Sequence, residues 1–434
     1  MNTMRKEISN NKQKIIFSHS TFALMRIIKL YIKSYSGLTS PAWMLALVLL
    51  INRSGSMVLP FLSLYLKDEL NFSIGDVALI LTLFGVGSLV GSFLGGILTD
   101  KIGTFAVQFW SLLLTGLGFI VLAQLRTVEE LAIGFFAITV ISDAFRPANA
   151  AAVAKHAKPE NLTRAYSLNR MAINLGFAIG PAVGGLLASI SYNMLFYVDS
   201  ISCVLASIVF AFYFYSRRNK KAPAAKNALT DMKVKSPFLD LRFLFFTLLT
   251  VGFGIVFFQF LFTLPVYYRD IYALSERSIG WLLALNGFIV FALEMPLVYI
   301  IGKKYSLRFT IVAGCLLLVL SFVSLNLDSG IYILIVAMFL LSVSEILVMP
   351  FLTTYTAHRG GEAARGRYLG LYSMAYSLSF IIAPSMGLFI IQNQGYPSLW
   401  WLVAALGVLV SVGFYFAVAP VKVKPEIAKA IDNV

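Results

Sequence analysis

The charged side chains inside long apolar stretches are the residues of this 434-residue chain that could carry chemistry. Glu294 lies in the middle of "NGFIVFALEMPLVY" and Glu345 in the middle of "LSVSEILVMPF". A charge in a hydrocarbon setting is costly, so such residues mark functional sites. A buried carboxylate near an arginine can be switched between its charged and protonated forms as its surroundings open and close. We therefore expect Glu294 and Glu345 to carry protons, unless each is a permanently protonated, hydrogen-bonded acid.

A second charged group lies in "SDAFRPANAA", residues 142–151. Asp143 and Arg146 are three residues apart, so they share a face of a helix. A neutralised pair costs less to bury than either charge alone. We expect this pair to respond to the proton or to the substrate, the alternative being a structural ion pair that keeps its charge throughout. Pro147 should disturb the helix at this point.

Two more arginines lie within apolar stretches. Arg53 belongs to the first of them, and Arg170 lies so early in another that its long side chain could reach the aqueous surface. Polar residues on the same stretches are candidates for lining a substrate cavity. These candidates are Asn52, Arg53, Asn149, Asn169, Gln259 and Asn286.

Other kinds of chemistry find no support in the sequence. The two cysteines, Cys203 and Cys315, lie far apart in apolar stretches and offer neither a disulfide framework nor a metal site. The three histidines lie in polar segments. We find no nucleophile with a base and no phosphate-binding loop. We therefore expect no enzyme activity, no metal and no cofactor, with the proton as the coupling ion.

The elements that position these residues are membrane helices. The chain is 59% hydrophobic and only 13% charged, whereas soluble domains are about 25% charged. Each membrane span needs about 20 apolar residues. This length predicts an all-α membrane protein with twelve transmembrane helices, at 42–66, 75–99, 104–125, 130–153, 165–189, 193–215, 240–268, 278–301, 307–326, 330–352, 366–391 and 396–418.

The distribution of positive charge predicts the orientation of these helices. Of the 35 Lys and Arg residues, 28 lie in the two tails and in the loops on their side, four lie on the opposite side and three lie within spans. Positive residues stay in the cytoplasm, so we expect both termini there, in a bacterial inner membrane. The net charge of +15 reflects this orientation and favours contact with anionic lipids rather than nucleic acid.

The chain divides into two similar halves. We expect a cytoplasmic tail with an interfacial helix at 1–41, a six-helix bundle at 42–215, a polar linker at 216–239, a second bundle at 240–418 and a tail at 419–434. "RPANAAAV" (146–153) aligns with "MPFLTTYT" (349–356), and Arg164 with Arg367, both at an offset of 203 residues. Parallel six-span halves are a known transporter plan, with a small-molecule site between them. We expect a monomer.

The loop after the second predicted span resembles the signature of the major facilitator superfamily. In "GGILTDKIG" (95–103), Gly96, Asp100, Lys101 and Gly103 match the pattern Gly-x-x-x-Asp-Arg/Lys-x-Gly-Arg/Lys, while Thr104 departs from its last position. The resemblance implies the major facilitator fold and a latch, in which the aspartate holds the two halves together in the outward-facing state. A charged turn is the alternative.

The fifth predicted span resembles a motif of proton-driven antiporters in the same superfamily. Gly176, Gly180, Pro181, Gly184 and Gly185 match Gly-x-x-x-Gly-Pro-x-x-Gly-Gly, and their spacing of four also suits close helix packing. In span four, Arg146 matches an arginine that antiporters use in proton transfer, whereas Asn149 and Ala150 replace the usual Gln-Gly. The resemblance implies a proton-coupled exporter of small lipophilic or drug-like molecules.

An alternative is a proton-coupled symporter for a zwitterionic or anionic solute, such as a small peptide. Arg53 and Arg146 in one half facing Glu345 in the other resemble the charge arrangement of proton-coupled oligopeptide transporters. The first span lacks their Glu-x-x-Glu-Arg pattern, so this is the second hypothesis.

Overall fold

The computed structural model describes residues 29–188, 190–216, 236–274, 276–327 and 330–418. These residues form helices and no strand. A short helix covers 29–35; the rest of the predicted interfacial helix, most of the linker and the last tail lie outside the described residues. The helices are α2 (Ser40–Ser54), α3 (Val58–Leu64), α4 (Ile74–Ile102), α5 (Thr104–Leu122), α6 (Val128–Asp143), α7 (Phe145–His156), α8 (Leu162–Ala188), α9 (Asn193–Phe214), α10 (Leu241–Phe262), α11 (Leu264–Tyr272), α12 (Glu276–Lys304), α13 (Leu307–Ser324), α14 (Tyr332–Arg359) and α15 (Arg365–Ala417).

Ten helical stretches of the described chain are long and apolar enough to cross a membrane. The longest, α15, contains two predicted spans, which meet at Gly395, where φ is 80°. The fourth predicted span is divided between α6 and α7. The all-α membrane fold is therefore confirmed, and its spans follow the order that the apolar pattern predicts.

Three spans that the sequence presents as continuous are broken, and the seventh of the predicted spans, 240–268, is divided at Thr263 between α10 and α11. Span one ends its first helix at Ser54 and begins its second at Val58. Span four is interrupted at Ala144, because Pro147 has no N–H to donate to the carbonyl of Asp143. The matching Pro350 lies inside the unbroken α14. The two halves therefore differ in the span that carries Asp143 and Arg146. It is broken in the first half, whereas its counterpart in the second half, α14, is continuous.

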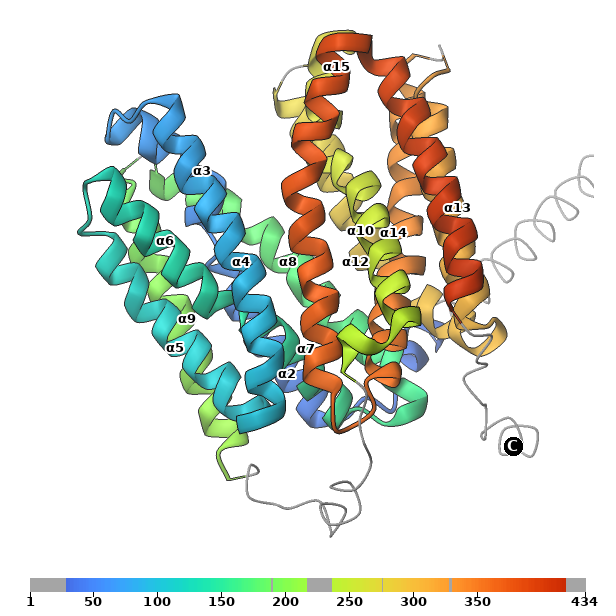
Figure 1. Ribbon diagram of the computed structural model, residues 1–434, viewed down its shortest axis with the longest axis horizontal. Helices are drawn as coiled ribbons and strands as arrows, with labels where there is room; N and C mark the ends of the chain where they lie inside the picture. Colours follow the sequence, from blue (N-terminus) through green and yellow to red (C-terminus); the bar gives the residue numbers. More distant parts are fainter. Residues whose placement is uncertain (1–28, 189, 217–235, 275, 328–329, 419–434) are drawn as a thin grey trace, which may run out of the picture.

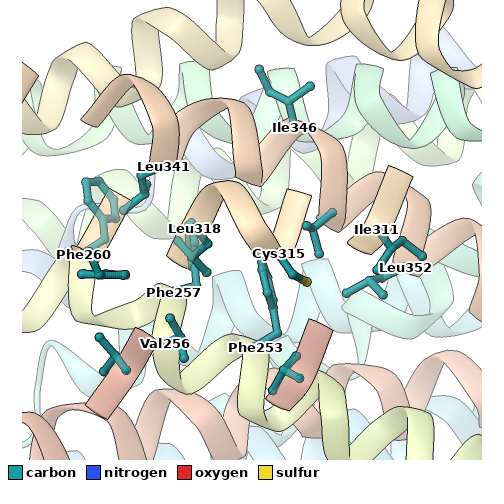
Figure 2. Close-up of a cluster of buried hydrophobic side chains, with 14 of the residues drawn as sticks. Phe253, Val256, Phe257, Phe260, Ile311, Cys315, Leu318, Leu341, Ile346 and Leu352 are labelled. Carbon is teal, nitrogen blue, oxygen red and sulfur yellow. The ribbon is translucent and has the colours of Figure 1, made fainter. Parts of the chain in front are cut away.

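Helices α2–α9 form one bundle and α10–α15 the other (Figure 1). The ribbons of the two bundles lie close together at the lower end of Figure 1 and diverge toward the upper end. We call the lower end the Asp100 end, because α4 ends there. The core of the second bundle packs aromatic and aliphatic side chains of α10, such as Phe253 and Phe257, against Cys315, Leu318 and Leu341 of α13 and α14 (Figure 2).

Candidate functional site

Arg170 of α8 binds two glutamates of the opposite bundle. Its Nε lies 3.0 Å from Oε1 of Glu294 on α12, and its Nη2 lies 2.6 Å from Oε1 of Glu345 on α14. Both glutamates are buried. The amide of Asn286 donates to the second oxygen of Glu345 at 3.0 Å, whereas the second oxygen of Glu294 has no partner within the described chain. We call Arg170, Glu294 and Glu345 the triad.

The charge balance of the triad suits a proton site. One guanidinium cannot neutralise two ionised carboxylates, so the triad carries one net negative charge when both are ionised. A buried net charge is costly, and the uptake of one proton removes it. The triad also joins the two bundles, so that a change in its charge bears directly on the contact between them.

The structure contradicts our interpretation of Arg170 as a residue that reaches the aqueous surface. Its side chain is only 17% exposed, and its remaining nitrogen, Nη1, contacts the sulfur of Met349 at 2.7 Å. Among the described residues, the Glu345 carboxylate binds Arg170 and Asn286.

Asp143 and Arg146 form an ion pair with 3.0 Å between Oδ1 and Nε, as their spacing predicts. The Asp143 carboxylate also accepts a hydrogen bond from Ser88 of α4. The hydroxyl of Ser88 lies 2.9 Å from that of Ser377 on α15. The pair is therefore connected through two serines to the opposite bundle.

Asp199 of α9 is a buried carboxylate that our sequence analysis missed. It accepts hydrogen bonds from the backbone N–H groups of Met57 and Val58, at 2.8 and 3.1 Å, where α3 begins. A carboxylate at the start of a helix is stabilised by the free N–H groups there. Asp199 thus stabilises the break in span one. The signal was visible, because it is a lone charge in the apolar stretch 193–215.

Arg53 lies just before this break and makes no ion pair within the described residues. Its Nε is buried without a hydrogen-bond partner, and its guanidinium lies 6.0 Å from the ring of Phe177 on α8. The neighbouring Asn52 donates to the sulfur of Cys203 at 3.3 Å.

The remaining cavity candidates differ in their hydrogen-bond partners. Asn149 and Asn169 are buried, and the side-chain oxygen of each has no partner in the described chain. Asn286 contributes to the triad. Gln259 is fully buried and donates to the carbonyls of Ile255 and Ala383, so in this structure it joins α10 to α15.

The predicted latch connects the two bundles at the Asp100 end. The Asp100 carboxylate accepts from the backbone N–H groups of Gly366 and Arg367, at 2.8 and 3.0 Å, and from Nε of Arg367 at 2.9 Å. It therefore binds both the start of α15 and a side chain in that first turn. A Cβ on Gly96 would lie 2.7 Å from the carbonyl oxygen of Gly366. Glycine is thus required at this close approach of the two bundles.

The other two latch candidates have different positions. Lys101 is exposed and makes no ion pair among the described residues. Gly103 ends α4 with φ of 87°, which disfavours other residues, and this turn begins α5 at Thr104.

The glycines of α8 pack against the broken first span. A Cβ on Gly176 would lie 2.5 Å from the Cβ of Arg53, and one on Gly180 would lie 3.1 Å from the carbonyl oxygen of Ser56. Gly184 faces Met57 and Phe61, whereas Gly185 has more room. Pro181 lies within the same helix. The motif thus lets α8 approach the break closely, directly beside Arg53.

Comparisons with known proteins agree with this architecture. Residues 42–359 and 270–432 match the Major Facilitator Superfamily. The chain is 26% identical over 363 residues to the MFS-type transporter YttB of Bacillus subtilis (strain 168), covering 81% of this chain and 88% of the relative. It is 22% identical over 366 residues to the multidrug resistance protein MdtH of Yersinia enterocolitica, covering 83% and 90%.

The fold also matches a solved structure, that of the proton:xylose symporter XylE. The TM-score is 0.70 at 14% identity, covering 89% of this chain and 97% of the other. Because the family match extends over most of the chain, including both bundles, the assignment does not depend on any single motif. The chain belongs to the major facilitator superfamily, and it is a multi-pass membrane transporter rather than an enzyme.

Proposed function

We propose that this chain is a proton-coupled exporter of small lipophilic or drug-like molecules that works by alternating access. The observation that carries the proposal is the triad, in which Glu294 and Glu345 of one bundle share Arg170 of the other. Protonation of either glutamate weakens the attraction across the interface, because only ionised carboxylates form strong charge-assisted bonds with a guanidinium. Proton binding therefore shifts the balance between conformations.

The conformation of the structure fits one stage of this cycle. The latch between Asp100 and Arg367 holds the bundles together at the Asp100 end, and the ribbons diverge at the other (Figure 1). With the predicted orientation, the Asp100 end is cytoplasmic and the structure is the outward-facing state. Release of the triad and of the latch then opens the cytoplasmic side.

Ser88 couples the Asp143–Arg146 ion pair to this conformational change. It links Asp143 to Ser377 of the opposite bundle, so separation of the bundles removes one of the hydroxyl groups around the pair. The ion pair then responds to the conformational switch rather than causing it.

The second bundle offers aromatic surface for a lipophilic substrate. Phe258 packs edge-on against Tyr376 and Phe380, and Phe262 packs edge-on against Phe380. Tyr376 also lies within electrostatic range of Arg170. This position next to the triad, together with the similarity to the multidrug resistance protein MdtH, supports a lipophilic substrate.

The test is proton flux in proteoliposomes. Purified protein is reconstituted with a trapped pH dye, and lipophilic compounds, a dipeptide and xylose are added in turn under an imposed pH gradient. In an exporter of this type, substrate and proton move in opposite directions. The double variant Glu294→Gln/Glu345→Gln should lose gradient-driven transport.

Glu130→Gln is the matched control, because Glu130 is an exposed capping residue at the start of α6. Full gradient-driven transport in both single variants, Glu294→Gln and Glu345→Gln, and in the double variant would rule out the proposed proton site. Movement of proton and substrate in the same direction would instead favour a symporter for a zwitterionic or anionic solute. This second candidate function is supported by the presence of two arginines, Arg53 and Arg146, in the first bundle.

A further inference from the structure

We propose that Arg53, together with Arg146, forms a subsite for an anionic group of the substrate. The inference rests on the proposed function only in that the ligand is a transported small molecule. A charged residue in a membrane span requires a partner, and the described residues supply Arg53 with none.

The carboxylates that could have neutralised Arg53 already have other partners. Asp143 binds Arg146 and Ser88, and Asp199 accepts from two backbone N–H groups at the start of α3. Glu294 and Glu345 share Arg170. Arg53 lies within electrostatic range of Arg146, Asp143 and Asp199, so it belongs to the same polar region without pairing there.

The neighbouring donors fit an anion. On α8, Arg170, Asn174 and Phe177 recur at helical spacing and share a face. The side-chain nitrogen of Asn174 is buried without a partner, like Nε of Arg53. A buried donor without a partner requires an acceptor, and a carboxylate, sulfonate or phosphate group supplies one.

Arg146 can contribute to the same subsite. Its Nε binds Asp143, and 42% of its side chain is exposed. The chain of contacts from Asp143 through Ser88 to Ser377 places the pair beside the interface between the bundles. Arginine suits such a role because its planar donors match a carboxylate in pairs.

Phe177 identifies the apolar side of this subsite. Its ring faces the Arg53 guanidinium and is itself 46% exposed. A ligand with an anionic group and a flat apolar body can therefore contact the arginine and the ring together. This chemistry selects lipophilic organic anions over lipophilic cations.

The experiment compares three fluorescent probes that share one ring system: anthracene-carboxylate, anthracene-methanol and aminomethyl-anthracene. Each is titrated at neutral pH into the purified chain in nanodiscs of neutral phosphatidylcholine, with empty nanodiscs to correct for partition. We expect the carboxylate to bind about tenfold more tightly than the other two, a difference of about 1.4 kcal/mol. Arg53→Gln should abolish that preference, and Arg53→Lys should keep part of it.

Binding of the neutral probe and a thermal unfolding curve establish that each variant is folded. If Arg53→Gln does not fold, the preference for the carboxylate probe is measured in Arg146→Gln, which should also lose it. Arg269→Gln is the matched control, because Arg269 is a surface residue with an exposed partner. Equal affinity for the three probes in the wild type, or an unchanged preference in the folded Arg53 and Arg146 variants, would overturn the proposal. Equilibrium binding needs no pH gradient, so this result is independent of whether transport is driven by protons.

Discussion

Arg170 and Glu345 bind each other across the two bundles, with 2.6 Å between Nη2 and Oε1, although they are 175 residues apart in the chain. The same guanidinium binds Glu294 at 3.0 Å. One side chain thus holds two carboxylates of the opposite bundle. This relationship makes the contact between the bundles dependent on charge.

The first prediction concerns the removal of that guanidinium. Arg170→Gln leaves two buried carboxylates without their cation, and the loss of one partner of a buried ion pair costs about 3–5 kcal/mol. We expect a marked decrease in thermal stability in detergent. Adding Glu294→Gln to Arg170→Gln should restore part of it, because one of the stranded charges is then absent. Purely additive losses would show that the two residues are not coupled.

The second prediction concerns the latch. Asp100→Asn weakens the contacts with Arg367 and with two backbone N–H groups, and charge-assisted hydrogen bonds contribute about 1.5–3 kcal/mol each. The Asp100 end should therefore open more often. We expect maleimide to label Ser92→Cys about tenfold faster in this background, since Ser92 is fully buried beside Gly370.

Asp76→Asn provides the control for the latch, because it makes the same chemical change in an exposed capping box at the opposite end of α4. The native cysteines, Cys203 and Cys315, are buried and give the background rate. An equal labelling rate with Asp100 and with Asn at this position would contradict the role of the latch.

Some residues of the candidate site could be predicted from the sequence, but their contacts could not. Glu294 and Glu345 could be identified from the sequence because a charge within a membrane span is costly and therefore marks a functional site. Their shared partner could not be deduced, since the depth and direction of Arg170 depend on how the bundles pack. Asp199 carried the same local signal as the glutamates. The break near Gly55, by contrast, depends on Asp199, whose carboxylate comes from another span.

The fold could be predicted from the sequence more completely than the side-chain contacts. The thickness of the membrane sets the length of a span at about 20 apolar residues. The positions of the spans along the chain can therefore be predicted from the apolar stretches of the sequence. Pro147 predicts a local disturbance, yet the matching Pro350 leaves α14 unbroken. A proline in a membrane helix is tolerated when neighbouring groups satisfy the freed carbonyl, which is a property of the packed structure.

The third prediction tests the glycine motif of α8. Gly176→Ala places a methyl group 2.5 Å from the Cβ of Arg53 and 2.9 Å from its backbone, so the two helices must separate. Overpacking of this kind costs about 1–3 kcal/mol. We expect a lower unfolding temperature and weaker expression of the folded form.

Gly185→Ala is a control within the same motif, because its new Cβ would meet only the ring of Phe61, at an ordinary 3.6 Å. Alanine is also the better helix former, so this variant should be neutral or slightly more stable. Equal losses at both positions would show that the motif acts through something other than close packing.

The last prediction concerns pH and the residue that precedes α10. Nε and Nη2 of Arg359 bind the two oxygens of Asp240 at 2.8 and 2.9 Å, and the hydroxyl of Tyr368 donates to the same carboxylate. The hydrogen bonds from Arg359 hold the pKa of the Asp240 carboxyl below its ordinary value of about 3.9. The carboxyl of the folded protein is therefore protonated only at a lower pH than that of the unfolded chain.

Because the pKa of the folded state is the lower one, the stabilisation is complete above the ordinary value and is lost as pH falls through that value toward the folded one. We expect Asp240→Asn to be about 1 kcal/mol less stable than the wild type at neutral pH, since Arg359 is partly exposed. The difference should shrink below about pH 5. Thermal unfolding in detergent at a series of pH values measures it, and a difference that stays constant down to the lowest pH would mean that ionised Asp240 is not its source.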